Sequence, residues 1–405
     1  MESGALLTEN SKSVLVSGAA VLVGDLPLTG SAAMRDAVWG RLLTAKPLLA
    51  MKPDGHALAS LANLEPADAS IMGLHQLMAL FVAEMALQES GLVLQRQRIR
   101  GSAHQHRHAG IGCISGSSLG GMPEFESNLA QAQKLSPYAL SRWRGNSIGA
   151  AVTTRFGLGG GDYSLNAASA TGAQCLYLAG TLIQAGVCDA IVVVAADAPA
   201  TPKLLESMKR NGSHTKDPAH GPLSEKRSGM NPVPGAACLI LESAEHLHAR
   251  SGHALAAWSG GACANEAFHM LAPEPTGTVL TGMLNGLSAL PDWISLHATG
   301  TPSFDTIEIA AIEAMQKQRR DWRPWLTAMK SVTGHALGAS GLIEAALAVE
   351  GLNRGAVPPW PTNTDPAIAL DKLRPDRPPK PESALLIGQG MGGNVVVNRL
   401  NAART

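Results

Sequence analysis

One segment of the sequence, residues 161–198, places a sharp turn and a helical pattern between two strand-like stretches. It reads GDYSLNAASATGAQCLYLAGTLIQAGVCDAIVVVAADA. A strand, the turn NAASATG, a helix of about 15 residues and a very apolar strand follow one another, which predicts a βαβ unit. Because the last strand is apolar throughout, we expect a buried parallel sheet.

The succession of strand, glycine-flanked turn and helix recurs in the rest of the chain. Before residue 250 the pattern predicts strands within 13–24, 109–122 and 236–243 and helices within 72–91, 147–160 and 244–252. A second set follows in the segments 254–264, 276–287, 293–300, 305–318, 326–352 and 384–400. We therefore predict a duplicated α/β architecture, with halves in residues 1–250 and 251–405 and one active centre where the halves meet.

Composition excludes several classes of function. The 405 residues carry no net charge, so we expect no nucleic-acid partner. No run of about 18 apolar residues occurs, so we expect no membrane span. The five cysteines have no CxxC spacing and lie in apolar segments, which predicts buried, reduced thiols in a cytoplasmic protein. No motif indicates a metal or a bound cofactor.

Ser169 stands in the turn NAASATG, where a helix begins. Its hydroxyl would lie near unpaired backbone N–H groups and the positive end of the helix, which suits a nucleophile or an oxyanion site. Serine is also a common N-cap, so the local sequence leaves both interpretations open.

Two histidines and a lysine occur in similar turns of the second half. His297 ends a predicted strand in LHATGTPSFDTIE, and Lys330 and His335 surround the turn in MKSVTGHALGASGLIE, with Glu344 on the next helix. A single histidine is usually structural. Two at the sheet-to-helix edge, where α/β proteins form their sites, together with a lysine predict a catalytic centre.

Taken together, these motifs resemble those of the β-ketoacyl-acyl-carrier-protein synthases of the thiolase superfamily, over nearly the whole chain. SLNAASATGAQ resembles the T-A-C-A-T/S-G elbow, and SLHATGTPSFDTIE resembles N-A-H-G-T-G-T-x-x-x-D-x-x-E. MKSVTGHALGASGLIE is similar to K-S-x-x-G-H-x-x-G-A-A-G, and IGQGMGGNVVV is similar to S-F-G-F-G-G-T-N. ANEAFHMLAP and GAVPPWPTNTDP match lesser signatures of the family.

The resemblance implies a dimeric, thiolase-like duplicated αβαβα layered fold. In the family a cysteine takes an acyl chain from an acyl carrier protein, and a decarboxylated malonyl unit then attacks it. Carried over, His297 and His335 would bind the malonyl thioester oxygen through neutral N–H groups, and Lys330 would order His335 and Glu344. The resemblance also assigns substrate contacts to Thr299, Thr301, Gly390, Met391 and Gly392.

The phosphopantetheine arm of the carrier protein is the only prosthetic group that the resemblance implies. Lys203, Lys209 and Arg210 lie in PKLLESMKRNGSHTK, on the expected pocket side, where an acidic carrier protein could dock. A solvated helix face accounts for the three charges equally well, so both interpretations stay open.

Ser169 takes the place of the family's cysteine. A serine hydroxyl is far less acidic than a thiol and needs a partner base. The helix end supplies only about 0.3–2 kcal/mol, too little to replace that base. A histidine acting as base would be lost as a donor to the enolate, so we expect condensation at this site to be impaired.

Other motifs also depart from the family pattern. R-D-G-F-x-x-G-E-G-A-G appears as RSGMNPVPGAAC, from Arg227 to Cys238. Met391 stands where a gating phenylalanine usually lies, and the threonine of G-G-T-N is missing. Such changes are expected in a subunit that no longer catalyses the condensation.

Three functions remain open. The first is a chain-length-factor-like partner of a cysteine-bearing ketosynthase in a type II polyketide or fatty acid synthase, as a heterodimer or else a homodimer. The second is an enzyme that acylates Ser169 or decarboxylates malonyl-carrier for chain initiation. The third is an ordinary condensing enzyme whose cysteine was changed to serine by engineering.

Overall fold

The computed structural model describes residues 12–24, 31–44, 48, 53–101, 107–130, 135–360, 364–368, 373, 375 and 378–403. The strands are β1 Val14–Val23, β2 Ile111–Gly116, β3 Asp162–Leu165, β4 Ala190–Asp197, β5 Gly235–Ser243, β6 Ala256–Asn265, β7 Trp293–Ser295, β8 Trp325–Thr327, β9 Ser383–Gly390 and β10 Asn394–Ala402. The helices are α1 Ser31–Leu43, α2 Gly55–Leu61, α3 Pro66–Ala69, α4 Leu74–Ser90, α5 Met122–Ala130, α6 Ala139–Trp143, α7 Ser147–Phe156, α8 Thr171–Gln184, α9 Pro202–Arg210, α10 Ala244–Ala249, α11 Thr278–Asn285, α12 Pro302–Gln318, α13 Lys330–Thr333, the 3₁₀ turn η1 Leu337–Ala339, and α14 Ser340–Arg354.

The order of the strands confirms the predicted duplication. The sheet runs β3-β2-β4-β5-β1 and continues as β6-β10-β9-β7-β8. The two halves of the sheet correspond strand by strand when they are followed outward from the centre. The matching pairs are β1 with β6, β5 with β10, β4 with β9, β2 with β7 and β3 with β8. Each pair of neighbours in one half has the same relative direction as its counterpart in the other. The division near residue 250 falls between α10 and β6 and stays a prediction, because one sheet joins both halves.

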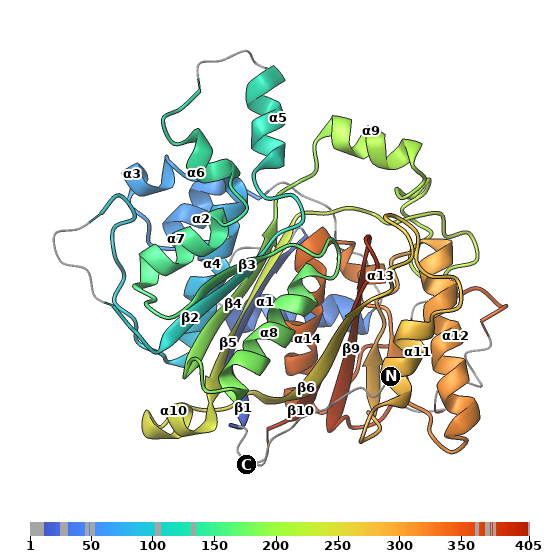
Figure 1. Ribbon diagram of the computed structural model, residues 1–405. Coiled ribbons are helices and arrows are strands. Elements are labelled where there is room, and N and C mark those ends of the chain that lie inside the picture. Colours follow the sequence, from blue (N-terminus) through green and yellow to red (C-terminus); the bar gives the residue numbers. More distant parts are fainter. Residues whose placement is uncertain are drawn as a thin grey trace.

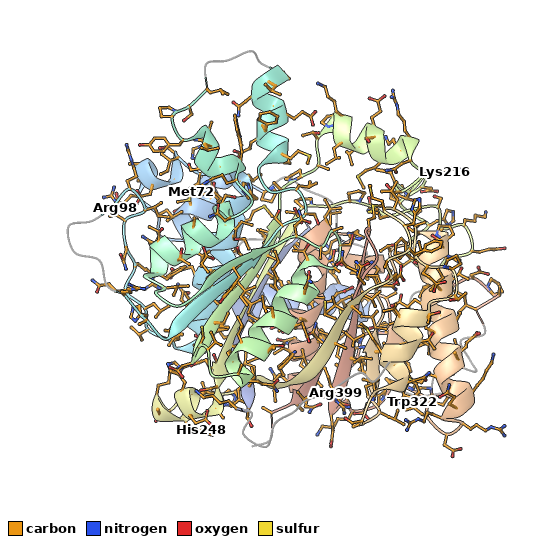
Figure 2. All side chains as sticks on the ribbon, viewed as in Figure 1. Met72, Arg98, Lys216, His248, Trp322 and Arg399 are labelled. Atoms are coloured by element: carbon orange, nitrogen blue, oxygen red, sulfur yellow. The ribbon has the colours of Figure 1, made fainter. Side chains whose placement is uncertain are left out.

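The elements stack in five layers, as the αβαβα prediction requires. The helices α8 and α14 lie together in the middle, between the strands of the two halves (Figure 1). One apolar cluster joins α4, α2 and α7 to the outer face of the first set of strands, and another joins α11 and α12 to the second set. Side chains fill the space between these layers (Figure 2).

Strand β4 shows why the sequence of this region is apolar throughout. Ile191 and Val193 belong to the central cluster around α8 and α14, whereas Val192 and Val194 belong to the outer cluster under α4. Successive side chains of a strand point to opposite faces, so a strand covered on both faces needs apolar residues at every position.

The expectation of a buried sheet is wrong for β3. β2 lies between β3 and β4 and pairs in parallel with both, so the βαβ unit skips one strand. β3 is therefore the edge of the sheet, and Asp162, Tyr163 and Ser164 are exposed. Its sequence, DYSL, is less apolar than that of β4, which agrees with the exposure of side chains on both of its faces.

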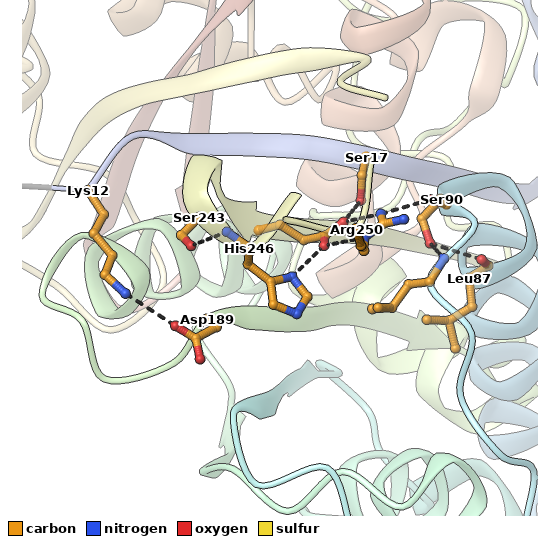
Figure 3. Close-up of polar contacts among 10 residues, drawn as sticks. Lys12, Ser17, Leu87, Ser90, Asp189, Ser243, His246 and Arg250 are labelled. Atoms are coloured by element: carbon orange, nitrogen blue, oxygen red, sulfur yellow. Dashed lines mark hydrogen bonds and ion pairs between the residues drawn. The ribbon is translucent and has the colours of Figure 1, made fainter. Parts of the chain in front are cut away.

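A polar cluster joins β5 and β1 to α10 (Figure 3). The buried Glu242 at the end of β5 accepts hydrogen bonds from Ser17 of β1 and from the ring of His246 in α10. The Arg250 guanidinium lies 2.8 Å from Glu242 Oε2 and donates to the backbone oxygen of Ser90. These partners satisfy a buried carboxylate, so we assign the cluster a structural role.

The cysteines agree with the prediction from composition that they are buried and not paired in disulfides. All five cysteines are free; Cys113, Cys175, Cys188 and Cys238 are buried, and Cys263 is half-buried. Cys175 points into the core, and burial raises the pKa of its thiol to about 12, so it does not replace a nucleophile. Within the described ranges, no helix has the length and apolar character needed to cross a membrane.

Candidate active site

The duplication brings two turns together at matching ends of the central helices. Ser169 lies in the turn between β3 and α8, and His335 lies in the turn between β8 and α14. Because α8 packs against α14, both turns open at the same place, where the two halves meet. This is the predicted position of the active centre.

The turn before α8 is a strained elbow. Ala168 has a φ of 50°, a left-handed conformation that is uncommon for alanine. The Thr171 hydroxyl accepts a hydrogen bond from the Ala167 N–H at 2.9 Å and donates to the Ala168 carbonyl at 2.6 Å. Ser118 also donates to that carbonyl, at 2.8 Å. These bonds hold the backbone that presents Ser169.

Gly390 allows this elbow to approach β9. A Cβ atom at Gly390 would lie 2.2 Å from the Ala167 carbonyl oxygen, a distance that real Cβ atoms do not adopt. The predicted substrate contacts at Gly390 and Gly392 are therefore not side-chain contacts. Gly390 provides room for the elbow, and Gly392, with a φ of 87°, forms the turn into β10.

Ser169 does not cap the helix. The N-cap of α8 is Ala170, which makes no side-chain capping bond, and Ser169 is half-buried. In the part of the chain that the structure describes, no hydrogen bond involves the Ser169 hydroxyl. The elbow places this oxygen in a cavity but provides no base for it.

His335 is a buried neutral imidazole with an available donor. Its Nδ1 atom accepts a hydrogen bond from the Leu337 N–H at 2.9 Å, so the ring proton resides on Nε2. Burial, assisted by the charge of Lys330, lowers the pKa of His335 to about 3. Within the described residues Nε2 has no hydrogen-bond partner, although it is buried. Such an N–H group suits the developing charge of a thioester oxygen.

His297 lies edge-on to His335, with ring centroids 6.1 Å apart. Burial first, and then the charge of Lys330, hold the pKa of His297 well below its usual range, so this ring is also neutral at pH 7. Phe304 packs against the ring with a centroid distance of 6.3 Å. Both rings are thus neutral, which is the state that the resemblance implies, and their roles as donors stay predictions.

Lys330 and Glu344 lie behind the histidines as a buried ion pair. The Lys330 ammonium is 2.7 Å from Glu344 Oε1 and donates to the His297 carbonyl oxygen at 2.6 Å. Side-chain exposure is 2% for Lys330 and 3% for Glu344. Lys330 thus orders His297 through its backbone rather than holding the ring of His335, which refines the role implied by the resemblance.

Ser169 and His297 line one cavity of about 400 Å³, which we call the site cavity. The predicted contacts Thr299, Thr301 and Met391 also line it, whereas Lys330, Glu344, Gly390 and Gly392 do not. His335 lines a smaller neighbouring cavity of about 30 Å³, which shares Thr299 with the first. The further lining residues include Asn211, Ser213, Met230, Leu271, Phe304 and Gln389.

The predicted carrier-docking residues lie on α9, an isolated helix at the edge of the molecule (Figure 1). Lys203, Lys209 and Arg210 are exposed, and Arg210 pairs with Glu206 at 2.6 Å. Lys216, also exposed, lies beyond the end of this helix (Figure 2). The residues directly after α9, 211–213, line the site cavity, so the C-terminal end of this helix lies beside the cavity.

The segment that departs from the family motif, residues 227–238, still supports His335. The Asn231 carbonyl accepts a hydrogen bond from the His335 N–H at 2.9 Å, and the Val233 N–H donates to the His335 carbonyl at 3.0 Å. The lost acidic residues and glycines therefore leave the backbone role of this segment intact.

Three residues that the sequence analysis did not assign also belong to the site. Glu308 accepts hydrogen bonds from the backbone N–H groups of His297 and Ala298, at 2.5 and 2.8 Å. Asp305 accepts from those of Thr299 and Gly300. Both acids occupy the D-x-x-E positions of a quoted motif, which could have revealed them. Gln389 also lines the site cavity; it lies inside the quoted stretch IGQGMGGNVVV, but the motif assigned it no role.

Comparison with known proteins agrees with this geometry. Family models for the β-ketoacyl synthase N-terminal and C-terminal domains match residues 43–246 and 252–363. A chloroplastic 3-oxoacyl-[acyl-carrier-protein] synthase I of Hordeum vulgare is 29% identical over 64% of this chain and 60% of its own length. The tetracenomycin polyketide synthase ketoacyl synthase alpha subunit of Streptomyces glaucescens is 28% identical over 82% of both chains.

Solved structures share the fold. A β-ketoacyl synthase from Burkholderia phymatum has a TM-score of 0.80 and 21% identity, over 97% of this chain and 100% of that one. The ishigamide ketosynthase/chain length factor has a TM-score of 0.79 and 22% identity, with the same coverage. The chain spans about 60% of the length of the first curated relatives it matches. With both domain models matched in order, and with the elbow and the paired histidines in place, the chain belongs to the β-ketoacyl synthase family.

Proposed function

We propose that this chain is a ketosynthase-like subunit of a type II polyketide or fatty acid synthase, acting as a chain-length-factor-like partner of a cysteine-bearing ketosynthase. One observation carries the proposal. The elbow retains its backbone geometry, but Ser169 has neither a thiol nor, among the described side chains, a hydrogen-bonded base. Without a base the hydroxyl is a poor nucleophile, so the cavity is suited to shaping and holding an acyl chain.

The exposed edge of the sheet supports a dimer. β3 presents one side with no neighbouring strand, and Tyr163 on this strand is 40% exposed. Helix α5 adds exposed apolar side chains, with Phe125 at 42% and Leu129 at 60%. An uncovered strand edge and exposed apolar side chains are typical of an interface, here with the ketosynthase partner or with a second copy of this chain.

The acyl carrier protein and its phosphopantetheine arm form the second part of the proposal. One structural neighbour is described as a type II polyketide synthase acyl-carrier protein in complex with its ketosynthase. Here the cations of α9 stand beside the approach to the site cavity, where they would attract an acidic carrier. The free cysteines further suit a cytoplasmic location.

Two measurements test the proposal. The tagged chain is expressed with a cysteine-bearing homologue from the same genome, and we expect the two to copurify as a heterodimer. The isolated chain is then incubated with acyl-loaded carrier protein, and intact-mass spectrometry is expected to show no added acyl group. A mass gain that disappears in S169A would overturn the chain-length-factor role.

The histidine pair favours a second candidate, decarboxylation of malonyl-carrier for chain initiation. Loss of CO₂ leaves the electron pair of the broken C–C bond on the α-carbon, and the charge spreads to the thioester oxygen. The Nε2–H group of His335 can stabilise that oxygen, and a proton from solvent completes acetyl-carrier. Release of CO₂ that H335A abolishes would establish this activity.

Sequencing the encoding gene decides whether the serine is engineered.

A further inference from the structure

Gln389 lies in the site cavity with a side-chain amide that no described protein group satisfies. The residue is 1% exposed, and both its Nε2 and Oε1 atoms are buried without a hydrogen-bond partner among the described residues. Buried amides are almost always hydrogen-bonded, because an unsatisfied one loses its interactions with water and gains nothing in return. An amide that lines a cavity in this condition has a donor and an acceptor available to a polar group of whatever fills the cavity.

Packing along β9 does not account for a polar side chain at position 389. Along this strand Leu385 and Ile387 point into the outer apolar cluster with α11 and α12. Gln389 continues the same row by the two-residue alternation of a strand, so an apolar side chain would suit the row. Of this row of side chains, Gln389 is the one that lines the site cavity, together with residues 301–304 at the start of α12.

The remaining cavity wall restricts the chemistry of the ligand. No aspartate, glutamate, lysine or arginine lines the site cavity as the structure describes it, and His297 is neutral. Met230, Leu271, Phe304 and Met391 make much of the wall apolar. A charged group would be unpaired there, whereas a neutral carbonyl or hydroxyl group on an otherwise apolar chain could be satisfied by the amide.

We propose that Gln389 is a specificity-determining residue that selects acyl chains oxygenated near the thioester, such as β-keto or β-hydroxy chains, over saturated alkyl chains. Its Nε2 donates to a carbonyl oxygen, and its Oε1 accepts from a hydroxyl or enol O–H. The inference rests on the proposed function, because it assumes that the cavity holds a carrier-bound acyl chain. It adds the substrate class, which favours polyketide over fatty acyl chains.

The test compares two probes that differ by one oxygen, acetoacetyl-pantetheine and butyryl-pantetheine, by equilibrium binding to the purified full chain. We expect the natural protein to prefer the keto probe by about tenfold or more, because a site that hydrogen-bonds a ligand oxygen discriminates against the analogue lacking it. In Q389L we expect the affinity for the keto probe to fall to that for the butyryl probe. The affinity for the butyryl probe itself is expected to stay unchanged. The control variant K317M, at an exposed position outside the site cavity, is expected to retain the preference for the keto probe.

Thermal melting of the unliganded proteins gives a second, independent measurement. Q389L removes an unsatisfied buried amide, so its melting temperature is expected to equal or exceed that of the natural protein. A clearly lower value would mean that the amide is satisfied within the protein, which overturns the inference.

The remaining outcomes separate this inference from the proposed function. Equal binding of both probes, or a Q389L variant that keeps the keto preference, overturns the inference alone. If Q389L instead loses affinity equally for unacylated pantetheine and for both probes, the amide binds the carrier arm, which also overturns the inference. Binding of no pantetheine probe by a well-folded protein overturns the proposed function together with the inference.

Discussion

The turns before α8 and α14 occupy matching places in the two halves, and their side chains have very different surroundings. In the second half, His335 has a defined tautomer, and Lys330, Glu344 and Glu308 secure its neighbour His297. In the first half, hydrogen bonds secure the backbone of the elbow, but Ser169 itself has no described partner. The comparison shows that positioning an atom and activating it are separate tasks.

This difference has a chemical consequence. The second turn offers neutral N–H donors in a buried setting, which can stabilise charge on a thioester oxygen. The first turn keeps the helix N-terminus and the strained backbone but lacks a nucleophile that works without a base. The predictions below alter one turn at a time, with a control for each.

The largest effect is expected from K330M, which removes one partner of the buried ion pair behind the second turn. Glu344 would remain as an uncompensated buried charge, so the free energy of unfolding should fall by about 3–5 kcal/mol. Urea denaturation measures this loss. The exposed Lys317 provides the control K317M, which should be neutral. The double variant K330M/E344L should recover much of the loss, and failure to recover would contradict the explanation.

S169C restores a thiol at the first turn. We expect it to form an acyl adduct with acyl-carrier protein at least about 100-fold faster than the natural chain, because a thiolate needs no partner base. Intact-mass spectrometry over time measures the rate. S303C places a thiol in the same cavity away from the elbow and should stay unmodified. Equal rates of acylation in the unmodified chain and in S169C would contradict the proposed difference between the two turns.

T171V tests whether the elbow depends on its hydroxyl. Thr171 is fully buried, and its loss would leave the Ala167 N–H and one bond to the Ala168 carbonyl unmade. We expect a loss of about 1–3 kcal/mol in chemical denaturation. On the same helix, Thr181 bonds only to the Tyr177 carbonyl one turn earlier, so T181V should cost much less. Similar losses in both variants would show that the elbow needs no special support.

The second turn should also make the protein sensitive to acid. His335 has its pKa lowered to about 3 by burial and by Lys330, so the folded state excludes a proton that the unfolded chain binds below about pH 6.5. Stability should therefore fall as the pH drops from 6.5 to 3, by up to about 1.4 kcal/mol per pH unit for this group. H335Q should flatten the profile over that range. The exposed His253 offers the control H253Q, and a profile unchanged by H335Q would contradict the assignment.

The smallest effect is expected at α9. The double variant K203E/K209E should weaken binding of the acidic carrier protein by about fivefold, mainly through the association rate and more strongly at low salt. Surface plasmon resonance at two ionic strengths measures it. K317E, an exposed charge reversal on α12, is the control. Unchanged affinity in K203E/K209E would favour the solvated-face interpretation of these lysines.

The sequence alone determined the duplicated α/β pattern and indicated the positions of the elbow and the two histidines, because these depend on local patterns, whereas the five layers were implied by the family resemblance. Alternating and continuous apolar runs specify strands, and glycine-flanked turns mark where a helix begins. Asp305 and Glu308 could also have been identified, because they occupy the D-x-x-E positions of a quoted motif. The prediction of buried thiols, made from the apolar segments around the cysteines, is confirmed for Cys175 in the central cluster.

The tertiary structure decided what depends on neighbours distant in sequence. It made β3 an exposed edge by placing β2 between β3 and β4, left Ser169 without a described base, and gave Lys330 the His297 carbonyl as its partner. It also buried Gln389 unsatisfied in the cavity wall. Burial and hydrogen-bond partners arise from contacts between separate elements, and no local pattern of residues specifies them.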